Sequence, residues 1–270
     1  MPTKRIVALL TDFGTQDHYV GVMKGVILRH AHSVTFVDIT HGVEPHDIQS
    51  AAYMLWASYR HFPQDTVFLA IVDPGVGTER RIVCVRDAGY TFLAPDNGLL
   101  KFVLGEMRRP KVYAVMSDNR LLRAASPTFH GRDVFAPLCA RLAAGASPST
   151  LGREVRAQTR PEHFVVVAKA GPRPIAGSII HVDRFGNLVT NFSLRTGPAV
   201  RLSLSRPPAK RKSFKPIESF ARTYADGSHR SPFMLIGSSG LLEVSMRNAS
   251  AQKALGLETG SLVHLHVRRG

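Results

Sequence analysis

Residues 66–81 read TVFLAIVDPGVGTERR, an apolar run that ends at Asp73 and passes through a turn to Arg80 and Arg81. The apolar part has the length and composition of a buried strand, and the Pro-Gly-Val-Gly segment is typical of a turn. A turn requires neither the carboxylate nor the two guanidinium groups. Their position at the end of a strand therefore suggests a functional site.

This strand is the third in an alternating series. The runs 5–13 and 33–40 are also strand-like, and segments 17–30 and 46–62 carry apolar residues at helical spacing. An order of strand, helix, strand, helix, strand predicts an α/β domain with a mostly parallel sheet. The next two apolar runs, RIVCVR and YTFLAP, are separated only by DAG and predict a hairpin.

The pattern changes after Gly145. Segment 146–164 has no clear apolar period and is predicted to be a connection. From about residue 172, short apolar runs alternate with turn residues in SIIHVDRFGNLVTNF, RLSLS, FARTYADG, FMLIGSSGLLEVSMR and SLVHLHV. These runs predict an all-β, barrel-like second domain. We therefore expect an α/β domain at 1–165 and a β-barrel-like domain at 172–270.

The composition excludes some classes of protein. No run of about 18 apolar residues occurs, so we expect no membrane span. The apolar stretch before TDFG is interpreted as a first strand rather than a signal peptide. Cys84 and Cys139 stand far apart in apolar contexts, which favours reduced thiols in a cytoplasmic protein.

The 270 residues carry a formal net charge of +15. Such a charge is compatible with nucleic acid, an anionic membrane or an acidic ligand. Lysine and arginine are scattered, however, except in RPPAKRKSFK (206–215), which we predict to be an exposed loop. We favour a solvated basic surface and expect neither a nucleic-acid nor a membrane partner.

Polar side chains follow each predicted strand. In an open α/β sheet, ligands bind outside the carboxyl ends of the strands. The candidates there are Asp12, Asp17, Asp38, His41, Glu44, His46, Asp47, Asp73, Asp96, Asn97, His130, Arg132 and Asp133. Each has a structural alternative, since helix caps and turns favour Asp and Asn, and a single histidine is more often structural. Their conjunction on three consecutive strands favours a site.

Asp73, Arg80 and His130 together would supply a proton acceptor, a permanent cation and a second titratable group. Such a trio can hold and polarise a water molecule, and the arginine keeps the aspartate ionised. The sequence has no G-x-S-x-G elbow, no phosphate-binding loop and no H-E-x-x-H spacing. We therefore predict no metal site.

Six motifs resemble the S-adenosylmethionine (SAM) hydrolases, also called SAM hydroxide adenosyltransferases, which are relatives of fluorinase and chlorinase. The motifs are TDFG (11–14), VDPGVGTER (72–80), APDNG (94–98), TFHGRD (128–133), VDRFGN (182–187) and SSGLLEVSMRNA (238–249). The resemblance covers nearly the full chain. It implies an N-terminal α/β domain, a C-terminal β-barrel, and a homotrimer with ligand sites between neighbouring subunits.

The family reaction is displacement of L-methionine from C5′ of SAM by water, and it requires no metal or redox cofactor. The resemblance identifies Asp73, Arg80 and His130 as the water-activating trio, with Arg81 as the alternative to Arg80. It also implies that the glycines after Asp73 let the backbone approach the ligand.

The resemblance further implies a set of substrate contacts. Asp12 would hold the ribose diol and Asp183 the methionine ammonium group, while Phe185 and Asn187 would contact adenine. The remaining candidates are His46 near the nucleoside, Asp96 and Asn97, and Ser238, Ser239, Arg247 and Ala249 near the methionine end and adenine.

Two departures separate this sequence from the halogenating relatives. Those enzymes carry tyrosine where this chain has Asp73 and His130, and fluorinase has a loop insertion near residues 86–90. An ionised Asp73 would repel a halide, so we expect water as the nucleophile. Halide-dependent 5′-halogenation and a non-catalytic protein that binds an adenosyl ligand or nucleic acid are the alternatives.

Overall fold

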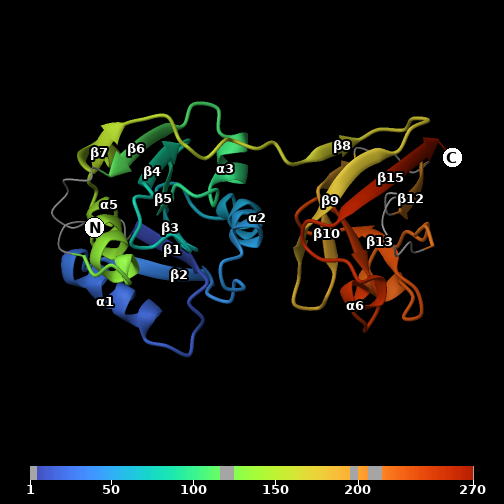
Figure 1. Cartoon of the computed structure of the whole chain (residues 1–270), viewed down its shortest axis with the longest axis horizontal. Coiled ribbons are helices and arrows are strands. Elements are labelled where there is room, and N and C mark those ends of the chain that lie inside the picture. Colours follow the sequence, from blue (N-terminus) through green and yellow to red (C-terminus); the bar gives the residue numbers. More distant parts are fainter. Residues whose placement is uncertain (1–4, 116–124, 195–199, 206–214, 270) are drawn as a thin grey trace. The chain divides into compact units, whose positions relative to one another are not determined.

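The structure is a computed structural model that describes residues 5–115, 125–194, 200–205 and 215–269. Its chain divides into two units, Met1–Glu162 and His163–Gly270, each with its own apolar core (Figure 1). The division falls within the segment that the sequence predicts to be a connection. Helices in the described residues are all too short or too polar to cross a membrane.

The first unit begins with the predicted alternation of strands and helices. Its elements are β1 (Arg5–Thr11), α1 (Tyr19–His30), β2 (Val34–Thr40), α2 (Ile48–Tyr59), β3 (Val67–Ile71), β4 (Ile82–Asp87), β5 (Tyr90–Pro95), α3 (Lys101–Glu106), β6 (Lys111–Val115), α5 (Ala136–Ala143) and β7 (Gly152–Glu154). The predicted hairpin is formed by β4 and β5, and it turns at Ala88 and Gly89, which both have positive φ. This tight connection leaves no inserted loop there.

The seven strands form one sheet in the order β2-β1-β3-β5-β4-β6-β7. β2, β1, β3 and β5 are parallel, whereas β4, β6 and β7 add antiparallel pairings. The sheet is therefore mixed, and only half of it matches the parallel arrangement that we predicted. The difference arises because the β4–β5 hairpin reverses the chain direction and the later strands continue from β4.

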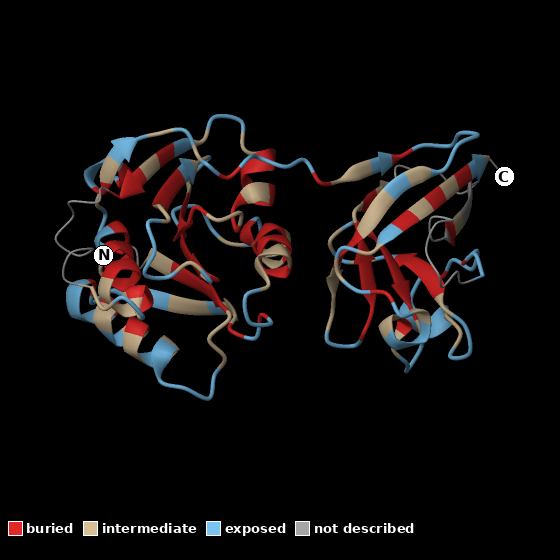
Figure 2. Ribbon diagram, viewed as in Figure 1, coloured by how far each residue is buried: buried red, intermediate tan, exposed pale blue. Residues whose placement is uncertain are grey.

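The parallel part of the sheet is covered on both faces, which explains why β3 is buried throughout (Figure 2). On one face, Leu9 and Leu69 pack with Met23 of α1 and Leu138 of α5 in the main core cluster. On the other, Tyr59 of α2 contacts the ring of Phe92, which stacks on Phe68 at 4.8 Å. Cys84 and Cys139 are free thiols buried in this unit.

The second unit is built on a six-stranded antiparallel sheet in the order β12-β15-β9-β10-β14-β13. These strands are β9 (Ile175–Val182), β10 (Leu188–Thr190), β12 (Val200–Ser205), β13 (Phe233–Ile236), β14 (Leu242–Ser245) and β15 (Leu262–Arg269), with β8 (Val166–Ala168) and β11 (Phe192–Leu194) as a separate parallel pair. Backbone hydrogen bonds join Ile217 to Leu204 of β12, and Ser219 and Ala221 to Met234 of β13. The segment between the two outer strands therefore bonds to both, and the sheet curls in a barrel-like manner.

One predicted strand of this unit is a short helical turn instead. Segment 220–227 was expected to be extended, but Tyr224–Asp226 forms a 3₁₀ turn. Asp226 accepts hydrogen bonds from the backbone N–H and the hydroxyl of Thr223, at 3.1 and 2.9 Å. This capping box favours a helical turn over a strand. The unit also contains α6 (Ala251–Leu255), a short helix that we did not predict.

The end of β5 is tied to the last segment of the first unit by Asp96. Its side chain, 1% exposed, accepts hydrogen bonds from Arg81 Nη2 at 2.7 Å and from the backbone N–H of Gln158 and Thr159 at 2.9 and 2.8 Å. Burial alone would raise the pKa of Asp96, but the hydrogen bonds from Thr159, Gln158 and Arg81 outweigh it and the pKa is lowered. Asp96 thus stabilises the fold as an ionised group.

We predict that Asp96→Asn lowers the free energy of unfolding by about 2–3 kcal/mol at pH 7, because it weakens three hydrogen bonds to a buried carboxylate. The lowered pKa means that this stabilisation is complete above the pKa of the unfolded chain and is lost as the pH falls through the folded pKa. Urea unfolding at several pH values should show the two proteins converging below about pH 4. Asp65→Asn, at an exposed turn, is the control; an equal effect there would contradict the prediction.

Candidate active site

Asp73, Arg80 and His130 come into contact just beyond the carboxyl end of β3. Arg80 Nε lies 3.0 and 2.8 Å from the two carboxylate oxygens of Asp73, and Arg80 Nη2 lies 2.5 Å from Asp73 Oδ2. The same Nη2 lies 2.9 Å from Nδ1 of His130. The guanidinium group therefore bridges the other two side chains. The side chains of Asp73 and Arg80 are only 5% and 11% exposed, and His130 is buried.

The turn between Asp73 and Arg80 is shaped by local hydrogen bonds and one special glycine. The N–H groups of Val76 and Thr78 donate to the carbonyl oxygens of Asp73 and Gly75. Gly77 has φ of +79°, and a Cβ there would lie 2.5 Å from the carbonyl oxygen of Pro127. This glycine therefore lets the turn pack against the segment that leads into His130. The approach of the backbone to a ligand, which the resemblance implies for these glycines, stays a prediction.

His130 stands where that segment enters a short π-helical turn, Gly131–Phe135, which continues into α5. Because arginine has only hydrogen-bond donors, Nδ1 of His130 must accept from Arg80, and the proton of the neutral ring then resides on Nε2. Burial and the Arg80 charge lower the pKa of His130, outweighing the opposing effect of Asp73 and Asp133. The site thus holds a carboxylate acceptor and a neutral imidazole donor on either side of a cation.

The geometry separates the two neighbouring arginines. Arg81 points to Asp96 and to the carbonyl oxygen of Arg156, and so takes no part in the trio. Both carboxylate oxygens of Asp96 accept hydrogen bonds within the protein, from Arg81, Gln158 and Thr159. Asn97 donates from Nδ2 to the carbonyl oxygen of Val72 at 2.8 Å, which supports the residue before Asp73. The contacts of both APDNG residues therefore fit a supporting role within the protein.

Asp12 follows β1 and lies beside a second loop. Asp12 Oδ2 accepts from the backbone N–H of His46 at 3.0 Å, and the N–H of Gly14 donates to the carbonyl oxygen of His41 at 2.8 Å. His46 is exposed and has φ of 69°, so its backbone conformation is adapted to this loop. His41 is buried, with Nδ1 2.8 Å from Thr11 Oγ1. The hydrogen bond from the His46 backbone thus places Asp12 and His46 next to each other.

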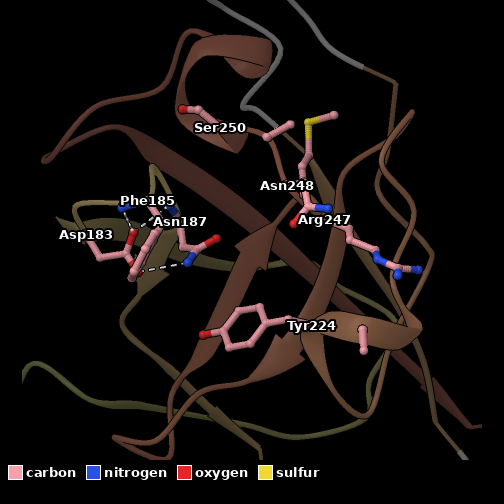
Figure 3. Close-up of a pocket in the computed structure, with 10 residues that line it drawn as sticks. Asp183, Phe185, Asn187, Tyr224, Arg247, Asn248 and Ser250 are labelled. Carbon is pink, nitrogen blue, oxygen red and sulfur yellow. Dashed lines mark hydrogen bonds between the residues drawn. The ribbon is translucent and has the colours of Figure 1, made fainter.

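The second unit contains a pocket of about 690 Å³ (Figure 3). Five of the predicted substrate-binding residues line it, namely Asp183, Phe185, Asn187, Arg247 and Ala249. Ser238 and Ser239 lie on the turn between β13 and β14 and are not among its lining residues. The pocket is also lined by residues that we did not predict, namely Tyr224, Ala225, Met246, Asn248 and Ser250. Tyr224 was not predicted to be a pocket residue, because segment 220–227 was expected to be a strand.

Asp183 organises one wall of this pocket. Its Oδ1 accepts from the backbone N–H of Phe185 and Asn187 at 2.9 and 2.8 Å, and its Oδ2 accepts from Asn187 Nδ2 at 2.8 Å. Gly186 has φ of +81°, and a Cβ there would lie 2.1 Å from Ser250 Oγ. The turn is therefore held tightly against Ser250, and it presents the ring of Phe185, which is 77% exposed. An exposed ring on a fixed turn is suited to stacking on a planar ligand.

In the described residues, no group of three or more His, Cys, Asp or Glu side chains is arranged to hold a metal ion. The basic segment 206–215 lies outside the described residues except for Lys215, so its predicted exposure stays a prediction.

Comparison with known proteins gives matches along most of the chain. Residues 7–152 match the family model of the SAM hydroxide adenosyltransferase N-terminal domain, and residues 177–264 match that of the C-terminal domain. The (R)-S-adenosyl-L-methionine hydrolase of Thermus thermophilus is 38% identical, with 97% of this chain and 99% of the relative covered. A fluorinase of Actinopolyspora mzabensis is 27% identical, with 97% of each chain covered. A crystal structure of an uncharacterized conserved protein from Thermotoga maritima superposes with a TM-score of 0.81 at 30% identity, with 96% of this chain and 99% of that chain covered.

We predict that the pKa of His130 lies below its ordinary value of 6.5, and that Arg80→Gln raises it. The substitution removes a neighbouring positive charge while the carboxylates of Asp73 and Asp133 remain. Titration of the histidine ring signals by NMR, with His130 assigned from a His130→Gln variant, measures both values. Arg86→Gln is the matched control, because that side chain is half-exposed and lies in another contact. An unchanged or lower pKa in Arg80→Gln would contradict this electrostatic account.

Proposed function

This chain belongs to the SAM hydroxide adenosyltransferase family, and from that premise we propose that it hydrolyses S-adenosyl-L-methionine to adenosine and L-methionine. The observation that carries the proposal is the buried contact of Asp73, Arg80 and His130. Hydrolase relatives of nearly the same length support the same activity. The homotrimer implied by the family resemblance is part of this proposal.

The water molecule would be held beside the carboxylate of Asp73. A carboxylate oxygen of Asp73 accepts a hydrogen bond from the water, since a carboxylate offers more acceptor positions than Arg80 occupies. Asp73 is therefore the group that takes the proton, while His130 acts through Arg80, from which its Nδ1 accepts a hydrogen bond.

The reaction forms one C5′–O bond and breaks one C5′–S bond. The water oxygen attacks C5′ in line with the sulfur, and the electron pair of the broken bond stays on the neutral thioether of L-methionine. The proton passes to Asp73 and then to solvent. The positive charge of the sulfonium disappears as the bond breaks, so a site that excludes bulk water favours the transition state. The carboxylate stabilises the positive charge that develops on the attacking water.

In the proposed homotrimer, the second unit of a neighbouring subunit would bind the remainder of the substrate. Phe185 presents an exposed ring for stacking on adenine, and Asn187 lies beside it in the same pocket. Asp183 carries negative charge near the pocket, which suits the methionine ammonium group, although its oxygens also hold the 183–187 turn. Asp12 would accept hydrogen bonds from the ribose hydroxyls. Ser238, Ser239, Arg247 and Ala249 complete the set of proposed contacts.

We predict that Asp73→Asn lowers kcat for SAM hydrolysis by about 10²–10⁴-fold, because it removes the proton acceptor. Release of adenosine and L-methionine, followed by chromatography, measures the activity, and ¹⁸O-labelled water should place its label in the 5′-hydroxyl of adenosine. Asp65→Asn, an acid-to-amide change at an exposed turn, is the matched control. Full activity in Asp73→Asn would contradict the assigned role, and a wild-type protein that releases no adenosine from SAM would contradict the proposed function.

A second prediction concerns the pocket of the second unit. Phe185→Ala should raise KM for SAM by about tenfold, with a smaller effect on kcat, because it removes a stacking surface that binds ground state and transition state alike. Phe220→Ala is the matched control, since Phe220 is also an exposed phenylalanine of this unit but lies outside the pocket lining. Steady-state kinetics separate the two parameters, and equal KM values for the two variants would argue against stacking at Phe185.

A further inference from the structure

Glu243 is a buried carboxylate in the middle of β14. The residue is 6% exposed, and its neighbours Leu242 and Val244 are fully buried. The described residues include no cationic side chain in an ion pair with it. Burial raises the pKa of Glu243, and the charge of Asp183 acts in the same direction. A carboxylate in such a place is costly, which makes its contacts informative.

The contact that satisfies this carboxylate comes from the pocket wall. The phenol O–H of Tyr224 donates to Glu243 Oε2 at 2.8 Å. Tyr224 lines the pocket and is 47% exposed (Figure 3). Its backbone is fixed by the 3₁₀ turn that Thr223 and Asp226 cap. Tyr224 is therefore held at both ends, by the 3₁₀ turn at its backbone and by Glu243 at its hydroxyl.

The other oxygen of the same carboxylate meets the turn between β13 and β14. A Cβ at Gly237 would lie 1.7 Å from Glu243 Oε1 and 2.3 Å from Cδ, so the backbone at Gly237 packs directly on the carboxyl group. Gly237 begins the turn that carries Ser238 and Ser239. One buried carboxyl group thus contacts both the aromatic wall of the pocket and the base of a turn with two proposed substrate contacts.

We propose that Glu243 is a positioning residue for the ligand of this pocket, and that it acts by fixing the ring of Tyr224 for contact with the planar adenine group. The inference rests on the proposed function in that the ligand is an adenosyl compound. An exposed ring that is held in one orientation before binding loses less conformational freedom when the ligand arrives. The hydrogen bond, rather than the charge of Glu243, is what the ring requires.

The affinity for adenosine, measured by isothermal titration calorimetry, tests this role without any need for turnover. Tyr224→Phe keeps the ring and removes the donor, whereas Glu243→Leu keeps the bulk and removes the acceptor. Each should weaken adenosine binding by about tenfold, as expected when an aromatic side chain has to be ordered on binding. The double variant should be no weaker than either single variant, because both remove the same interaction. Glu243→Gln, which retains an acceptor oxygen, should recover most of the affinity.

Thermal unfolding separates this role from a merely structural one. The raised pKa means that the folded protein holds the Glu243 proton more tightly than the unfolded chain does, so ionisation of Glu243 opposes folding at neutral pH. Glu243→Gln and Glu243→Leu should therefore unfold at a temperature no lower than the wild type, while only Glu243→Leu loses affinity. Tyr90→Phe, which removes a hydroxyl bonded to the carbonyl oxygen of Phe62 in the other unit, is the control.

Four results would overturn the inference. The first is that Tyr224→Phe binds adenosine with wild-type affinity, and the second is that the affinity losses of the single variants multiply in the double variant. The third is an equal loss of affinity in Glu243→Gln and Glu243→Leu, and the fourth is a wild-type protein that binds no adenosine. Failure of the proposed function has a different signature. A wild-type protein that binds adenosine but releases none from SAM would refute hydrolysis, while the variant series would still decide the role of Glu243.

Discussion

The bridge that Arg80 makes between Asp73 and His130 is the interaction on which the proposed chemistry depends. It joins the end of β3, the turn that follows and the start of the π-helical turn before α5. The guanidinium group balances the charge of a buried carboxylate and, by donating to Nδ1, sets the tautomer of the imidazole. Gly77 allows the turn that carries Arg80 to pack against the segment before His130, since any side chain there would meet the carbonyl oxygen of Pro127.

Three aspartates that follow strands of this chain differ in their hydrogen-bond partners. Asp96 and Asp183 accept from backbone N–H groups and thereby close turns or tie segments together. The side chain of Asp73 bonds to Arg80 alone among the hydrogen bonds described for it, which leaves acceptor positions for a ligand. The same residue type at three strand ends thus has different hydrogen-bond partners, and sequence position does not distinguish them.

Much of the fold could be predicted, because β1 to β3 and their helices have clear apolar periods and the two units differ in the spacing of turn residues. The prediction of a strand at 220–227 was wrong, because the mutual capping of Thr223 and Asp226 stabilises a 3₁₀ turn there. The resemblance supplied the trio, but the distinction between Arg80 and Arg81 depends on which carboxylate each meets. The hydroxyl of Tyr224 bonds to Glu243, which is 19 residues away, and no local pattern encodes such a contact.

The donors and acceptors of the trio also bear on the choice of nucleophile. A water molecule both donates and accepts hydrogen bonds, whereas a halide ion only accepts them. The carboxylate of Asp73 supplies an acceptor to which a water proton can donate. The cation that would otherwise attract a halide is already paired with that carboxylate, at 2.5 Å between Arg80 Nη2 and Asp73 Oδ2. A halide would therefore lose its hydration shell and face an anion, whereas water can donate a hydrogen bond to that anion.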